Sequence, residues 1–171
     1  MDQNIKNKIA ASVRDFSLPR YDTLPDMGLY LEQTTRYIAE HLEPLGSISI
    51  TSSMIGNYVK KGLIPSPVKK QYSRDQIAYL IFIAIAKTVL SLEDIQLLIQ
   101  MQKKVYSERV AYEYFCQEFE NVLAFVFGLK DSLDEVGVDH TDEKTMLRNT
   151  IITVAHKIYL DKNFSAIHPK S

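Results

Sequence analysis

Residues 47–74 form a strongly basic segment in a chain whose formal net charge is -1. The segment has a net charge of +5 and contains no Asp or Glu. Its basic residues are Lys60, Lys61, Lys69, Lys70 and Arg74. Lysine and arginine neutralise the phosphates of DNA, and a carboxylate on the same surface would repel them. A basic face that is only solvated has the same composition, so charge alone leaves both interpretations open.

Helical spacing separates the side chains near Lys60 into an inward and an outward set. The inward set is apolar and comprises Ile55, Val59 and Leu63. The outward set comprises Ser53 and Asn57 with Lys60 or Lys61. Asparagine can pair with the N6 and N7 edge of adenine, serine can bond to bases or phosphates, and lysine neutralises phosphate. Gly56 would allow a close approach to DNA, so the outward face has the chemistry of a recognition helix.

Periodicity predicts that helices position these residues and that the protein is all-α. We expect a helix over residues 26–43, followed by a short helix that Thr51 or Ser52 caps and that stops at Gly62. A helix, a tight connection and a second, short helix make a helix-turn-helix.

Residues 63–72 contain two prolines and cannot continue the short helix, so we expect an extended loop or a small wing. A stiff extended backbone there would hold Lys69 and Lys70 against a phosphate or a minor groove. Ser73 and Gln76 have the spacing of a capping box, which predicts that the next helix begins here.

Helical patterns also cover most of the rest of the chain. The remaining predicted helices are residues 2–16, 77–90, 91–102, 107–130 and 141–160. Residues 163–171 are predicted to be loose.

Several segments resemble the MerR family of regulators. The stretch SMIGNYVKKGLI, followed by Pro65, resembles the recognition helix and the start of the wing. VLSLEDIQLLI, at residues 89–99, is similar to a later helix of that family. The whole region, taken together with RYDTLPDMGLYLEQ at residues 20–33, is more similar still to a YkrK-like bacterial family of regulators. Gly56 and Asn57 stand where typical MerR proteins carry Arg and an aromatic residue, so no operator sequence carries over.

The resemblance implies an all-α protein with a MerR-like winged helix-turn-helix head and a helical C-terminal region. Its expected parts are an N-terminal helix and linker (1–25), a DNA-binding domain (26–104) and a dimerisation or effector region (105–171). We expect a sequence-specific regulator of transcription that binds double-stranded DNA as a homodimer. The expected DNA-binding residues are Ser52, Ser53, Gly56, Asn57, Tyr58, Lys60, Lys61, Lys69, Lys70 and Arg74.

Nothing in the sequence predicts an enzyme, a metal site or a cofactor. The four histidines are scattered, and none is paired with another His or Cys at metal-ligand spacing. The single cysteine, Cys116, is typical of a buried small residue in a reducing cytoplasm. The N-terminus lacks the apolar region of a signal peptide, and the apolar run 77–90 is too short to span a bilayer comfortably. We therefore expect a cytoplasmic protein.

Residues 106–127 are rich in aromatic side chains. These are Tyr106, Tyr112, Tyr114, Phe115, Phe119, Phe125 and Phe127. They can line a pocket for a small apolar effector, or form a core, or form a dimer seam with the predicted helix 141–160. An adaptor that binds a protein or an apolar ligand through this surface is the alternative function.

Overall fold

The computed structural model describes residues 2–169, and helices account for 64% of the structure. The helices are α1 (Gln3–Ala11), α2 (Leu31–Leu42), α3 (Ser52–Lys60), α4 (Arg74–Ala86), α5 (Leu92–Val105), α6 (Glu108–Val126) and α7 (Asp142–Ile167), with the 3₁₀ helices η1 (Tyr21–Thr23) and η2 (Glu43–Leu45). The strands are β1 (Leu29–Tyr30) and β2 (Gln71–Tyr72). The predicted all-α class is confirmed.

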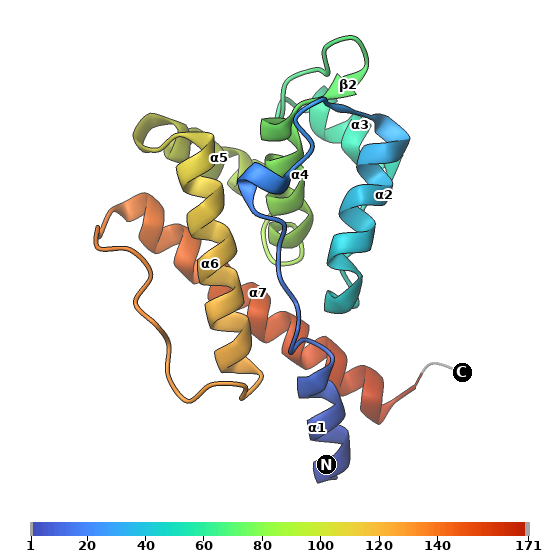
Figure 1. Ribbon diagram of the computed structural model, residues 1–171, viewed down its shortest axis with the longest axis vertical. Helices are drawn as coiled ribbons and strands as arrows, with labels where there is room; N and C mark the ends of the chain where they lie inside the picture. Colours follow the sequence, from blue (N-terminus) through green and yellow to red (C-terminus); the bar gives the residue numbers. More distant parts are fainter. Residues whose placement is uncertain (1, 170–171) are drawn as a thin grey trace.

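Helices α2 and α3 lie with the short sheet at one end of the molecule, the upper end in Figure 1. The strands are antiparallel, with Leu29 opposite Tyr72. This pairing explains why α2 begins at Leu31 and not at residue 26, because Gly28 turns the chain with a φ of +79° and the strand precedes the helix. The predicted end of the helix is close to the observed one, at Leu42.

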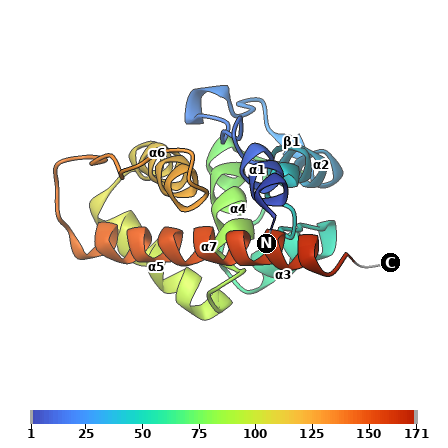
Figure 2. The ribbon, with the colours of Figure 1, turned by 90° about the horizontal axis from the view of Figure 1, so that it is seen from below.

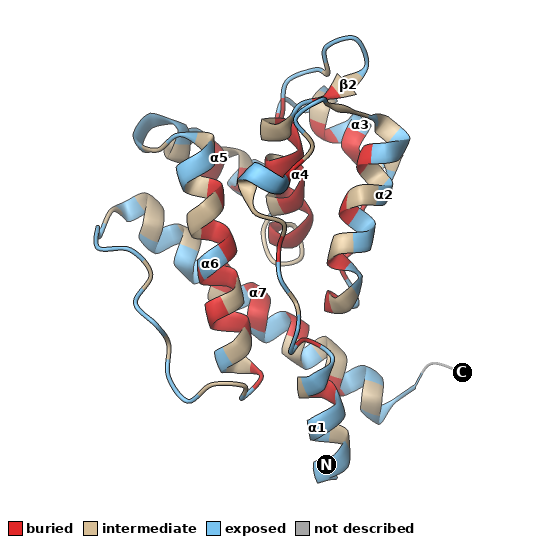
Figure 3. Ribbon diagram, viewed as in Figure 1, coloured by how far each residue is buried: buried red, intermediate tan, exposed pale blue. Residues whose placement is uncertain are grey.

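Helix α4 runs through the centre of the molecule. Ser73 and Gln76 form the predicted capping box at its start. Nine of its 13 residues are buried, which explains why the sequence shows a continuous apolar run and not an amphipathic stripe (Figure 3). None of the helices within residues 2–169 is both long enough and apolar enough to cross a membrane.

Helix α7 is the longest element and lies across the molecule, where α1, α4, α5 and α6 all contact it (Figure 2). It continues to Ile167, so the prediction of a loose tail from residue 163 is wrong as far as this point. The reason is that Asn163 is buried and its amide donates to the carbonyl oxygen of Tyr159. Residues 170 and 171, the end of the predicted tail, lie outside the described residues.

Helix α1 is shorter than predicted. It ends at Ala11, and the next residues form turns in which the Ser12 hydroxyl donates to the carbonyl oxygen of Ile9 over 2.7 Å. Val13 is nevertheless buried, so the turns keep the apolar side chain in the core.

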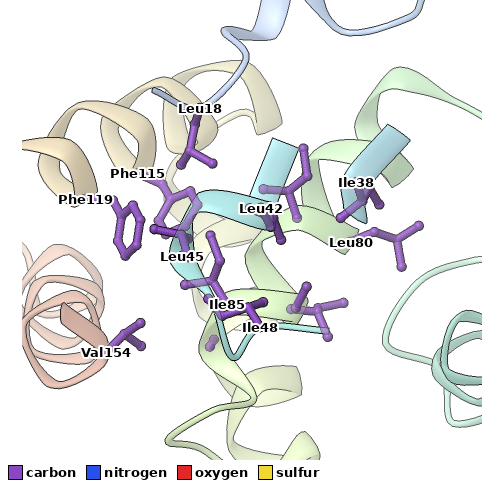
Figure 4. Close-up of a cluster of buried hydrophobic side chains, with 14 of the residues drawn as sticks. Leu18, Ile38, Leu42, Leu45, Ile48, Leu80, Ile85, Phe115, Phe119 and Val154 are labelled. Atoms are coloured by element: carbon purple, nitrogen blue, oxygen red, sulfur yellow. The ribbon is translucent and has the colours of Figure 1, made fainter. Parts of the chain in front are cut away.

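One hydrophobic core joins the parts that the sequence suggested were separate. Figure 4 shows Leu45 of η2, Ile85 of α4, Phe119 of α6 and Val154 of α7 in the same cluster. The cluster therefore continues across the expected boundary at residue 104.

Candidate nucleic-acid interface

Helix α3 has well-defined ends. The Thr51 hydroxyl accepts a hydrogen bond from the backbone NH of Met54 at 3.1 Å, as predicted for the cap. At the other end, Gly62 has a φ of +76° and donates to Val59, while Leu63 donates to Tyr58. This is the Schellman arrangement, in which a left-handed residue satisfies the last carbonyl groups of a helix.

One face of α3 is exposed and free of acid. Ser53, Gly56, Asn57 and Lys60 are all exposed and follow at i, i+3, i+4 and i+7, so they form a single stripe. We call these four residues the α3 stripe. Lys61, at the C-terminal cap, is also exposed. The opposite face is held in the core by Ile55, as predicted, and Figure 3 shows both faces.

Two of the predicted contact residues are turned toward the protein. Tyr58 is only 3% exposed, so its assignment to a DNA phosphate is corrected: it belongs to the core face with Ile55. Burial raises the pKa of its phenol. Ser52 is half-buried, and its hydroxyl lies 3.0 Å from that of Thr35, which links α3 to α2.

Lys69 and Lys70 occupy the tip of a tight turn. The backbone NH of Gln71 donates to the carbonyl of Val68 over 2.9 Å, and the two lysines have φ values of +50° and +64°. Positive φ at both central residues is the pattern of a type I′ turn, which usually carries Asn-Gly. The prediction of an extended backbone at these lysines is therefore wrong. Both side chains are exposed. We call residues 68–71 the lysine turn.

Gln76 fastens this turn to the core. The Gln76 amide nitrogen donates to the carbonyl oxygens of Pro65, at 2.9 Å, and Ser66, at 3.3 Å. Gln76 is buried at the start of α4, so the central helix holds the base of the loop that carries the lysines.

Arg74 is engaged within the protein. Its Nε donates to the carbonyl of Leu24 over 3.2 Å, its guanidinium lies 5.4 Å from the centre of the Tyr21 ring, and Asp26 is 3.7 Å away. These contacts occupy Arg74 with the segment before α2, so we correct its assignment as a DNA contact.

The other four basic side chains of residues 47–74 are exposed and can contact a partner molecule. Among the described residues, no acidic side chain forms an ion pair with Lys60, Lys61, Lys69 or Lys70. The unpaired positive charge of residues 47–74 is thus carried by lysines on α3, at its C-terminal cap and on the turn, and the exposed Arg36 of α2 adds to it.

Lys87 also positions α3, although its place in the sequence did not predict this role. Its ammonium group donates to the carbonyl of Ser49 over 2.6 Å and lies 3.1 Å from the sulfur of Met54, so it ties the segment before α3 to the end of α4. Partial burial lowers the pKa of Lys87. The signal in the sequence was a lone lysine at the end of an apolar run.

The described residues also bear on metal-ion and thiol chemistry. No group of three or more His, Cys, Asp or Glu side chains within residues 2–169 is arranged to hold a metal ion. Cys116 is fully buried, as predicted, and burial raises the pKa of its thiol to about 12.

Residues 19–118 match the protein family described as a domain of unknown function, DUF1836. The chain belongs to the DUF1836 family. The part that matches DUF1836 runs from the segment before α2 into α6, so it contains α3, the lysine turn and α4. No curated protein and no solved structure is similar enough to the chain to count as a match. The candidate interface thus lies entirely within the DUF1836 part of the chain.

Proposed function

We propose that the protein is a sequence-specific DNA-binding regulator of transcription with a MerR-like winged helix-turn-helix head. In this proposal α2 and α3 are the helix-turn-helix, α3 enters the major groove, and the lysine turn is the wing. The observation that carries the proposal is the α3 stripe, which is exposed, free of acid and rich in groups that bind bases and phosphates.

The dimensions of α3 support the proposal. The nine residues of α3 span about 13 Å, and an α-helix with its side chains is about 10 to 12 Å in diameter, which fits a major groove roughly 12 Å wide. The connection from Glu43 to Thr51 is longer than the usual turn of three to four residues. Leu45, Ile48 and Ile50 are buried along it, so the longer connection still holds α3 in a fixed place.

The conformational cost at Gly56, Lys69 and Lys70 also favours a DNA-binding face over a face that only contacts solvent. A glycine inside a helix costs about 1 kcal/mol relative to alanine, and nothing in the protein lies within 4 Å of a Cβ built at Gly56. The fold therefore does not require glycine there. Similarly, Lys69 and Lys70 adopt a left-handed backbone that glycine and asparagine adopt at lower cost.

We expect Asn57→Ala to relax base preference at one position of the operator. The loss should be about 1 to 3 kcal/mol on the preferred sequence and much smaller on random DNA, because the side-chain amide reads a base edge. Selection of bound fragments from random DNA, followed by sequencing and anisotropy titration, measures this.

Asn149→Ala is the matched control, since Asn149 is an exposed asparagine on α7. It should leave both affinities unchanged. If Asn57→Ala weakens binding equally on selected and random DNA, Asn57 does not read a base.

Gly56→Ala should separate stability from binding. We expect the free energy of unfolding to rise by up to about 1 kcal/mol, while affinity for the selected DNA falls at least several-fold because the added methyl group stands between helix and groove. Urea denaturation and anisotropy measure the two quantities. An alanine variant that binds DNA as tightly as the parent would show that α3 does not approach the bases closely.

A homodimer remains part of the proposal, but its interface is moved from the aromatic residues of α6 to an exposed apolar stripe on α7. Of the seven aromatic residues expected there, Tyr112, Phe115, Phe119 and Phe127 are buried in the chain's own core. This burial also removes most of the aromatic surface that a protein adaptor would use. The exposed apolar stripe on α7 comprises Leu160, Phe164 and Ile167, spaced at i, i+4 and i+7.

A dimer related by twofold symmetry would bind an inverted repeat with half-sites about one helical turn apart. The selection experiment reports this directly, since a selected sequence with a single, unrepeated site would contradict the dimer.

A further inference from the structure

A cavity of about 410 Å³ lies between α4, α5, α6, the segment that leads into α7 and the first turns of α7. It is separate from the α3 stripe and the lysine turn, none of whose residues line it. Pockets for small organic molecules typically span roughly 300 to 1,000 Å³. The cavity is therefore large enough for a small organic molecule.

Aromatic side chains make up much of its wall. They are Tyr79, Phe82, Tyr106, Tyr112, Tyr114 and Phe115. Phe82 of α4 and Phe115 of α6 meet edge to face, with ring centres 5.3 Å apart, so the two helices form a fixed corner of the wall. Such a wall favours flat apolar molecules, which gain contact area without leaving polar groups unpaired.

Most of the polar groups at the cavity already have partners. The Tyr79 hydroxyl donates to Gln102 over 2.9 Å, and the Tyr106 hydroxyl bonds to Asp139 and Thr141. Few groups are left that would demand a strongly polar ligand.

The charged residues of the wall disfavour a negative ligand. Its two basic residues are each paired with an acid, Lys144 with Asp139 and Arg109 with Asp22. Within residues 2–169, by contrast, Glu108, Glu113 and Glu143 form no ion pair. One further cation lies at the wall, because the ammonium group of Lys103 is 5.0 Å from the centre of the Tyr79 ring. The three carboxylates outnumber it, so the wall repels an anion, and the repulsion is strong where water is partly excluded.

We propose that this cavity binds a small aromatic molecule that carries no negative charge. The ligand's rings lie against the aromatic walls of α4 and α6, and its charge is selected by the uncompensated carboxylates. Ligand binding here does not depend on DNA, so it stands or falls separately from the function proposed above.

Two fluorescent probes with the same aromatic body test the proposal on the full chain. N-phenyl-1-naphthylamine is uncharged, and 8-anilinonaphthalene-1-sulfonate adds a sulfonate to the same skeleton. We expect the uncharged probe to bind saturably at one site and at least tenfold more tightly than the sulfonate. Equal affinities, or tighter binding of the sulfonate, would overturn the proposed charge selection.

Filling the cavity should remove this binding. Ala111→Phe places a ring in the cavity from α6, and Val110→Trp does so from a residue that is 54% exposed and therefore tolerant of change. Ala39→Phe, on the exposed face of α2, is the control.

We expect at least a tenfold loss of probe affinity in each filled variant and none in the control, with circular dichroism verifying that all three are folded. If the uncharged probe fails to saturate the parent, or binds folded filled variants as tightly as the parent, the cavity is not a ligand site.

Discussion

A chain that ends at Val105, after α5, should fail to fold, although the sequence predicted a separate DNA-binding domain over residues 26–104. The helices of the head pack directly on those that would be removed, as Phe82 does on Phe115 and Leu45 and Ile85 do in the cluster of Figure 4. Exposing a buried Leu, Ile or Phe side chain costs about 1.5 to 3 kcal/mol, and whole domains are stable by only about 5 to 15 kcal/mol. Losing several such contacts is therefore enough to unfold the remainder.

Far-UV circular dichroism and urea denaturation of residues 1–105 check this prediction. A cooperative unfolding transition of the shortened chain would contradict it. Two point variants of the full chain provide a graded version of the test. Phe119→Ala should cost about 3 to 5 kcal/mol, because Phe119 is fully buried, whereas Phe125→Ala should cost far less, since Phe125 lies on the same helix with 40% of its surface exposed.

Replacing Lys69 and Lys70 should weaken DNA binding on every sequence. Each phosphate contact that is lost should reduce the slope of log affinity against log salt by about 0.9, so the double change should reduce it by about 1.8. Two versions of the change separate charge from backbone strain. In one version both lysines become alanine, and in the other Lys69 becomes asparagine and Lys70 becomes glycine.

The two versions should affect stability differently. Asn-Gly fits the left-handed turn and should raise the free energy of unfolding by about 1 to 2 kcal/mol, whereas Ala-Ala leaves both residues in a left-handed backbone. Both should show the same loss of salt slope, measured by anisotropy between low and moderate salt.

The pair Lys6→Ala and Lys8→Ala is the control for net charge, because both lysines are exposed on α1, at the opposite end of the molecule (Figure 1). This variant should leave the slope close to that of the parent. A slope that stays unchanged when Lys69 and Lys70 are replaced would remove the turn from the DNA interface.

Local signals in the sequence located most of the helices. The hydroxyls of Thr51 and Ser73 cap α3 and α4 as expected, because a capping bond spans only three residues and needs no partner from elsewhere. The same holds for the α3 stripe, whose side chains share a face by helical geometry alone. Burial of Tyr58 was within reach too, since it follows Ile55 at i+3 on the inward face.

Other features depended on residues far apart in the chain. Arg74 is a basic residue like its neighbours in sequence, but contacts with Leu24 and Tyr21, about 50 positions away, occupy its guanidinium group. The left-handed turn at Lys69 and Lys70 depends on the pairing of Val68 with Gln71 and on the hydrogen bond from Gln76 to the carbonyl of Pro65. Together these contacts overcome the ordinary preference of lysine for negative φ.

The same contrast explains the C-terminal half. Composition alone shows that residues 106–127 carry many aromatic rings, and side chains of this size are expected to be buried in a core or an interface. Whether the cover is a second subunit, a ligand or the chain itself depends on how α4, α6 and α7 pack. Only their packing places Phe119 in the core and leaves a cavity beside Phe115, because a cavity is the space between helices and no single helix encodes it.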